Sequence, residues 1–179
     1  MFKLETPRLY LVETPLHVVE TRLKEEYFDS DLQIAGQIRR VHFVADWPGD
    51  ALGFFPNLAD RLRESSDAQF WNGILTLIDK IRMVAVGNMG TKGPPDATGT
   101  VDIGYGVNAS EEGRGYMTEA VQRFTDSLLA RLDVQRVTAD CLATNIGSRR
   151  VLEKAGFTRL GERYDADEGG TLIFWERRR

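Results

Sequence analysis

Two glycines one residue apart, Gly113 and Gly115, mark the segment whose residue types point most directly to chemistry. They follow a strand-like run and precede an amphipathic helix. Glycine has no Cβ atom, so a ligand can approach the backbone closely and φ can become positive. The first N–H groups of the following helix are unpaired and carry a partial positive charge. The segment therefore predicts either a site for an anionic group such as a phosphate, or a tight turn that binds nothing.

Two common phosphate motifs do not account for this segment. The chain contains no G-x-x-x-x-G-K-[ST] sequence, which excludes a kinase-type P-loop. Residues 104–109 match the dinucleotide fingerprint G-x-G-x-x-A, but a helix should begin inside that fingerprint. Here helical spacing begins only after residue 112, so residues 104–109 are interpreted as the end of a strand.

Length and composition limit the class of protein. A chain of 179 residues is expected to form a single domain, residues 1–179, with a sizeable core. The net charge of −4 argues against nucleic acid as the main partner. Cys141 is the only cysteine, which excludes an internal disulfide and favours a reducing cytoplasm. No signal peptide or membrane-spanning segment is evident, so a soluble cytoplasmic protein is expected.

Hydrophobic periodicity predicts a fold that mixes helices and strands. Pro15 opens a helix to about residue 27 after Thr14 as its N-cap, and Gly156 ends the last helix. Strands are predicted at residues 8–13, 70–78, 81–88, 100–107, 134–142, 157–164 and 171–176. Further helices are predicted at residues 31–43, 56–64 and 146–155. The expected class is α/β (α+β), with helices flanking a central, mostly antiparallel sheet of about seven strands.

The helix after the glycine loop carries an apolar stripe with spacings of three and four residues. Its members are Met117, Ala120, Val121, Phe124, Leu128 and Leu132. Such a stripe packs on a sheet. The order of elements is thus strand, glycine loop, helix, strand, Asn-led helix and Gly-Phe.

This order resembles that of the Gcn5-related N-acetyltransferases (GNAT superfamily), and most of all their branch of ribosomal-protein N-terminal acetyltransferases, the RimJ/RimL-like proteins. The likeness rests on residues 6–11 (TPRLYL), on residues 102–120 with the glycine loop, and on residues 145–157 (NIGSRRVLEKAGF). The resemblance implies the GNAT fold, in which the central sheet is splayed. It also implies acetyl-coenzyme A as co-substrate, with the pantetheine arm in the gap between the splayed strands.

The resemblance assigns the pyrophosphate of coenzyme A to the amides of residues 113–118. Arg114 either adds a charge-assisted contact or is a solvated arginine, and Asn145 contacts the cofactor arm, caps its helix, or does both. Glu112 departs from the family pattern, because a neutral or basic residue is usual there. The residues so assigned to the cofactor are Tyr105, Val107, Gly113, Arg114, Gly115, Tyr116, Met117, Thr118, Asn145 and Ser148.

Two residues are candidates for moving protons during the reaction. In strict alternation Asp102 lies on the glycine-bearing face of strand 100–107 and is the candidate general base, or else a salt-bridge partner. Many family members carry a tyrosine where this chain has Leu152, which cannot donate a proton. Ser148, one helical turn earlier, is then the candidate acid. His17 and His42 show no metal-ligand spacing, so no metal is expected.

The resulting hypothesis is an acetyl-coenzyme A-dependent N-acetyltransferase that acts by direct attack of a primary amine in a ternary complex. The alternative is a catalytically weak acyl-coenzyme A-binding module with a sensing or interaction role. A protein N-terminus, a polyamine, an amino acid and an aminoglycoside remain open as acceptors, and neither nucleic acid nor a membrane is expected as a partner. The sequence is compatible with a homodimer. The acceptor is expected to bind between residues 30–65 and the hairpin loops, and whether residues 30–65 form its site stays open. Four aromatic residues there either line a pocket or belong to the core: Trp47, Phe54, Phe55 and Trp71.

Overall fold

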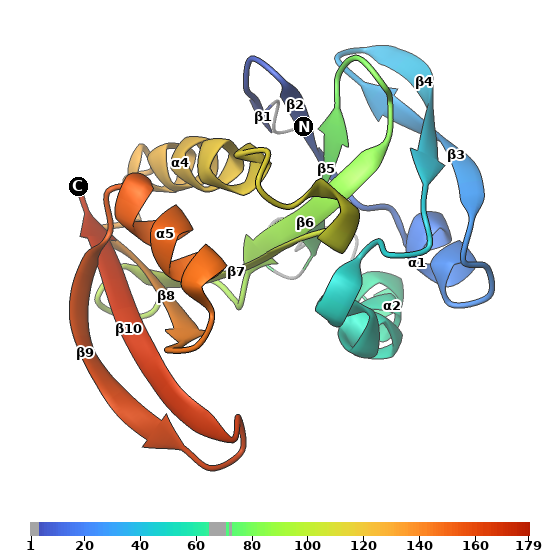
Figure 1. The fold of residues 1–179 in the computed structure, drawn as a ribbon. Helices are drawn as coiled ribbons and strands as arrows, with labels where there is room; N and C mark the ends of the chain where they lie inside the picture. The colour runs from blue at the N-terminus through green and yellow to red at the C-terminus, as the bar shows by residue number, and fades with distance from the viewer. Residues whose placement is uncertain (1–3, 65–70, 72) are drawn as a thin grey trace.

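The computed structural model describes residues 4–64, 71 and 73–179 (Figure 1). The strands are β1 (Leu4–Glu5), β2 (Leu9–Glu13), β3 (Phe28–Ile34), β4 (Gln37–Phe43), β5 (Ile74–Asp79), β6 (Ala85–Thr91), β7 (Thr100–Val107), β8 (Arg136–Leu142), β9 (Thr158–Asp165) and β10 (Gly170–Arg178). The helices are α1 (Leu16–Arg22), α2 (Phe55–Glu64), α4 (Tyr116–Leu129) and α5 (Ile146–Lys154), with the 3-10 helices η1 (Gly49–Phe54) and η2 (Ala109–Glu111). Within these residues, no helix is both long and apolar enough to cross a membrane.

One large sheet organises the chain. Its eight strands follow the order β1-β2-β5-β6-β7-β8-β10-β9, while β3 and β4 form a separate hairpin. Neighbouring strands of the large sheet are antiparallel, apart from the parallel pair β7 and β8. The predicted mixed α/β class with a mostly antiparallel sheet is confirmed, with eight strands rather than about seven.

Helices α4 and α5 cover one face of this sheet (Figure 1). Five of the six residues in the predicted apolar stripe are buried there, each 5% exposed or less: Met117, Ala120, Val121, Phe124 and Leu128. Leu132 was expected to continue the stripe, but it is 90% exposed because α4 ends at Leu129. The prediction for Leu132 is therefore wrong, and the rest of the stripe is confirmed.

The other face carries a second core beneath α1, α2 and the β3–β4 hairpin. The prediction of a helix over residues 31–43 is wrong, because these residues lie in the hairpin. Ala35 and Gly36 have φ of 53° and 83°, as the two central residues of a two-residue hairpin turn require. The buried residues on either side of the turn alternate with period two, which is a strand period: Leu32, Ile34, Val41 and Phe43.

Several boundaries also differ from the prediction. The first helix ends at Arg22 instead of residue 27, and Thr14 does not cap it, since the Thr14 hydroxyl shares a hydrogen bond with Thr76 Oγ1 at 2.7 Å. The strands β5 and β6 form the predicted antiparallel hairpin, but residues 80–84 make the turn. Residues 70 and 72 of the predicted strand lie outside the described part of the chain. Gly156 follows α5 with φ of 82°, as predicted for its C-terminal end.

Strand β7 separates from β8 after only three paired residues. Parallel pairing joins residues 100–102 of β7 to residues 136–138 of β8, and no later pair joins the two strands. On its other edge, β7 stays paired with β6 through Val107. Residues 103–107 therefore have no partner on β8 among the described residues, and the sheet is splayed at this point, as the family resemblance implied.

Gly87 provides a test of how closely β6 and β7 approach. A Cβ atom at Gly87 would lie 2.5 Å from the carbonyl oxygen of Gly106 and 3.1 Å from Val107 Cα. We expect Gly87→Ala to lower the free energy of unfolding by about 1–3 kcal/mol, because the backbone must shift to admit the methyl group. Denaturant unfolding measures this change. Gly161→Ala is the matched control, since a Cβ atom there meets no atom within 4 Å. Equal stability of the two variants would contradict the close approach.

Candidate active site

The glycine loop lies between η2 and α4. Both glycines have positive φ, 74° at Gly113 and 77° at Gly115, which glycine adopts without strain. Gly115 is the N-cap residue of α4, and no side chain in the described part of the chain caps this helix. A Cβ atom at Gly113 would meet no atom within 4 Å. The loop thus combines unpaired helix amides with open space, which is what an anion site needs.

A polar cluster of four residues fixes both ends of this loop: Asp79, Arg82, Glu111 and Tyr116. Both terminal nitrogens of the Arg82 guanidinium donate to the Glu111 carboxylate, each at 2.8 Å, just before the loop. The Tyr116 hydroxyl, just after the loop, donates to Asp79 Oδ2 at 2.5 Å. Asp79 is the last residue of β5 and Arg82 lies in the β5–β6 turn, so the end of this hairpin holds the loop in place.

Hydrogen bonds within this cluster stabilise the charged forms of Asp79 and Arg82. Burial alone would raise the pKa of Asp79, but hydrogen bonds from the Tyr116 hydroxyl and from the backbone N–H groups of Arg82 and Ile81 outweigh it and leave the pKa below its ordinary value. The hydrogen bond to Glu111 raises the pKa of Arg82, with burial acting in the opposite direction. Asp79 and Arg82 are therefore charged, hydrogen-bonded supports of the loop.

Arg8 joins the first strands of the chain to the same loop. Its Nε donates to Glu119 Oε2 at 2.7 Å, and its Nη1 donates to the carbonyl oxygen of Arg114 at 2.9 Å. The guanidinium also lies over the Tyr116 ring, 4.7 Å from its centroid. Arg8 belongs to the TPRLYL segment that carried the family resemblance, and the structure gives that segment a physical role in positioning the loop.

The side chains of the loop point in different directions. Tyr116 and Met117 are buried, so they can offer a ligand only their backbone amides. Arg114 is half-exposed and its Nε lies 3.3 Å from Glu111 Oε2, which makes it an ion-pair partner within the protein. Glu112 is exposed, as a residue beside an anion site would have to be, and Thr118 is half-buried in the first turn of α4.

At the splayed edge, the structure brings together two predicted residues from distant segments. The hydroxyls of Tyr105 on β7 and Ser148 on α5 lie 2.8 Å apart. Burial raises the pKa of Tyr105 above its ordinary value, more than the hydrogen bond with Ser148 lowers it, so the phenol keeps its proton at neutral pH. Asn145 caps α5, because its Oδ1 accepts from the Ser148 N–H at 2.9 Å. Leu152 is fully buried in the core.

Asp102 lies at the apex of the splay, in the last residue pair between β7 and β8. Lys92 Nζ lies 2.9 Å from Asp102 and 2.7 Å from Asp140 on β8, so one ammonium bridges both strands. Thr138 Oγ1 also donates to Asp102 at 3.1 Å. Burial lowers the pKa of Lys92, but hydrogen bonds to the two carboxylates reverse this and raise it overall. Asp102 therefore forms a salt bridge in the structure, and its role as general base stays a prediction.

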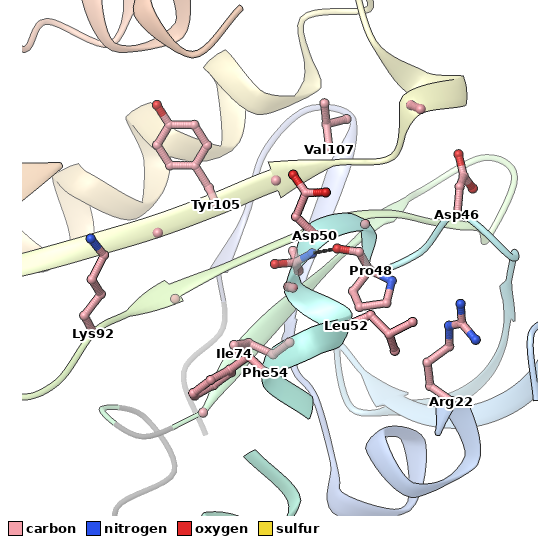
Figure 2. Close-up of a pocket in the computed structure, with 18 of the residues that line it drawn as sticks. Arg22, Asp46, Pro48, Asp50, Leu52, Phe54, Ile74, Lys92, Tyr105 and Val107 are labelled. Carbon is pink, nitrogen blue, oxygen red and sulfur yellow. Dashed lines mark hydrogen bonds between the residues drawn. The ribbon is translucent and has the colours of Figure 1, made fainter. Parts of the chain in front are cut away.

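A pocket of about 870 Å³ lies between η1 and strand β7 (Figure 2). Gly104, Gly106 and Val107 line it on the side of β7. Two hydrogen bonds hold the segment before η1 over β6: Trp47 Nε1 donates to the carbonyl of Gly87 at 3.2 Å, and Asn88 Nδ2 donates to the carbonyl of Pro48 at 2.7 Å. The pocket therefore lies where residues 30–65 meet the glycine-bearing strand.

The four aromatic residues considered for this pocket separate into two groups. Phe54 lines it and is 39% exposed. Trp47 and Phe55 are fully buried and pack edge to face in the second core, with ring centroids 5.5 Å apart. Trp71 is partly buried against the first core. Phe54 is thus the one of these four that contributes its side chain to the pocket.

Comparisons with known proteins agree with this arrangement. A family model described as an acetyltransferase (GNAT) domain matches residues 26–158. The chain is 28% identical over 163 residues to YjdG of Bacillus subtilis, an uncharacterized N-acetyltransferase, in an alignment that covers 88% of this chain and 90% of YjdG.

Solved structures share the fold over nearly the whole chain. A GNAT-family acetyltransferase from Bacillus anthracis gives a TM-score of 0.69 at 16% identity, covering 99% of this chain and 98% of its own. RimL, a ribosomal L7/L12 alpha-N-protein acetyltransferase in complex with coenzyme A, gives 0.68 at 16% identity, covering 97% and 95%. Because the family model spans most of the chain, this protein belongs to the GNAT family of acetyltransferases.

Proposed function

We propose that this protein transfers the acetyl group of acetyl-coenzyme A to a primary amine, by direct attack in a ternary complex. The observation that carries the proposal is the separation of β7 from β8 beside the glycine loop of α4. A gap next to an anion site suits a ligand with a phosphate end and a narrow acyl-bearing arm. That RimL was solved with coenzyme A supports this choice of donor.

The residues present fit such a donor. The amides of residues 113–118 would bind its pyrophosphate, since the loop leaves open space where a side chain at Gly113 would project. On β7, a Cβ atom at Gly104 would meet only Lys92 Cε, at 3.9 Å. The strand therefore also leaves room for the acyl-bearing arm of the donor. Asn145 and Ser148 lie at the start of α5, where the Ser148 hydroxyl meets the Tyr105 hydroxyl of β7. When bound, acetyl-coenzyme A supplies an activated acetyl thioester.

Acetyl transfer requires the protein to polarise one carbonyl group and to move two protons. The amine loses a proton and its nitrogen attacks the acetyl carbon; the carbon–sulfur bond then breaks and the sulfur takes up a proton. Backbone N–H groups of residues 103–107 that β8 leaves unpaired would polarise the carbonyl oxygen. The Tyr105–Ser148 hydroxyl pair would protonate the departing sulfur, because burial keeps the Tyr105 phenol protonated.

Asp102 remains our candidate for the group that accepts the proton of the amine. It shares a face of β7 with Gly104 and Gly106, which line the pocket. Its ion pair with Lys92 would have to open, or a water molecule would have to relay the proton.

Release of free thiol from acetyl-coenzyme A tests the proposed function directly. We expect thiol release that depends on an added primary amine or peptide N-terminus, with one acetyl group gained by the acceptor in mass spectrometry. Binding of coenzyme A in calorimetry without thiol release from any acceptor would contradict transfer. It would instead favour the acyl-coenzyme A-binding module.

The glycine loop can be tested by Gly115→Val. A β-branched residue at φ of 77° is strained by about 1–3 kcal/mol, and relief of that strain would move the loop amides. We expect the Kd for coenzyme A in calorimetry to rise by about tenfold or more. Gly169→Val is the matched control, because Gly169 also has positive φ, 66°, but lies in the β9–β10 turn. Unchanged affinity in Gly115→Val, or an equal loss in both variants, would contradict the phosphate site.

The hydroxyl pair can be tested by Tyr105→Phe and Ser148→Ala. Each variant removes one hydroxyl of the pair, so we expect kcat for acetyl transfer to fall by about a hundredfold, as for loss of a general acid. The Kd for coenzyme A should change less than kcat does. Tyr164→Phe serves as the control, since Tyr164 is 69% exposed on β9. If both variants kept the kcat of the unaltered protein, the sulfur would have to take its proton from another source.

A further inference from the structure

Asp50 places a carboxylate in the pocket beside β7. It lies in the first turn of η1, and Figure 2 shows its side chain pointing from η1 toward β7. Within the described residues, Asp50 forms no hydrogen bond or ion pair. Asp46, four residues earlier, accepts hydrogen bonds from the N–H and the hydroxyl of Ser110 at 3.0 and 2.7 Å. Asp50 is therefore available to a ligand in a way that Asp46 is not.

The other carboxylates near the pocket are engaged or lie at its rim. Asp102 and Asp140 both form an ion pair with Lys92. Glu112 lines the pocket as well and is exposed, as Asp50 is, but it lies just after η2, next to the glycine loop. Asp50 is thus the free carboxylate that faces the glycine-bearing strand from across the pocket.

The two arginines that line the pocket differ in the same way. Arg22 donates to the backbone carbonyls of Trp47, Glu25 and Ala45, at 2.6, 3.0 and 2.8 Å, which uses its guanidinium within the protein. Arg61 on α2 lies over the Phe54 ring, 5.5 Å from its centroid, and has no carboxylate partner among the described residues. Arg61 therefore brings an uncompensated positive charge to the Phe54 side of the pocket.

Apolar side chains separate the two charges. Leu52, Phe54 and Ile74 line the pocket, and Figure 2 shows Phe54 and Ile74 close together near the start of β5, on the side away from Val107. The pocket thus runs from a free carboxylate near β7, along an apolar wall, to a free guanidinium.

We propose that Asp50 binds the ammonium group of the acceptor, and that the acceptor is an α-amine followed by an apolar group and a neutral or anionic far end, as in a peptide N-terminus. This inference rests on the proposed function and names the acceptor class. A carboxylate forms charge-assisted hydrogen bonds with an ammonium group and would hold it opposite the residues of β7 that bind the acyl arm. A polyamine is disfavoured, because its second cation would meet Arg61.

A matched set of peptides tests the acceptor class. The tripeptides Ser-Leu-Glu, Ser-Leu-Gln and Ser-Leu-Lys, each amidated at the C-terminus, differ only in the charge of the far end, and spermidine represents the polyamines. With the unaltered protein and acetyl-coenzyme A, we expect kcat/KM from thiol release to fall in the order Glu, Gln, Lys, with spermidine the poorest acceptor. Arg61→Met should remove the difference between the Glu and Lys peptides.

The role of Asp50 is tested by Asp50→Asn. This variant should raise KM for all three peptides by about tenfold or more, because a charge-assisted hydrogen bond becomes a neutral one. The Kd for coenzyme A in calorimetry should stay within about twofold, which also shows that the variant is folded. Asp167→Asn, in the exposed β9–β10 turn, is the matched control for loss of one negative charge.

The outcomes separate this inference from the proposed function. Thiol release with an unchanged KM in Asp50→Asn, or with spermidine preferred to the peptides, would overturn the inference and leave acetyl transfer intact. Coenzyme A binding without thiol release from any of the four acceptors would overturn acetyl transfer to this class, and the inference with it.

Discussion

The ion pair between Arg82 and Glu111 is the interaction on which the proposed donor site depends. It is bidentate, its carboxylate is almost completely buried, and it ties the β5–β6 turn to the residue just before the glycine loop. Tyr116 and Asp79 close the other end of the loop in the same way. Removal of one partner from such a pair leaves an unpaired charge, which is costly. The loop amides are therefore held in place before any ligand arrives, and binding need not order them.

Splaying of the sheet would let one strand contact both proposed substrates. Strand β7 is paired with β8 only at its beginning, so its later residues face a gap on one edge while β6 supports the other. Gly104 and Gly106 have no side chains to fill the pocket beside β7. The 3-10 helix η1 lies across that pocket, and hydrogen bonds of Trp47 and Asn88 hold the segment before it. A donor in the gap and an acceptor in the pocket would meet at the same short stretch of backbone.

Local patterns in the sequence predicted most strands and helices in both halves of the chain, but they failed for residues 31–43. The glycine loop, the α4 stripe and the C-terminal hairpin follow from spacing that tertiary contacts reinforce. Residues 31–43 form a hairpin because Ala35 and Gly36 adopt left-handed φ, and no common turn dipeptide such as Asn-Gly marks that position. Arg8, Arg82 and Lys92 were missed because each has a partner far away in sequence. Asp50 was missed because a single acidic residue has no distinctive spacing.

Backbone hydrogen exchange with and without coenzyme A tests the central claim, that preformed amides of the glycine loop and the splayed strand bind the donor. The account predicts slower exchange at residues 113–118 and 103–107 on binding, with little change in the β3–β4 hairpin. Coenzyme A binding that leaves exchange at both segments unaltered, or that protects the hairpin instead, would contradict it.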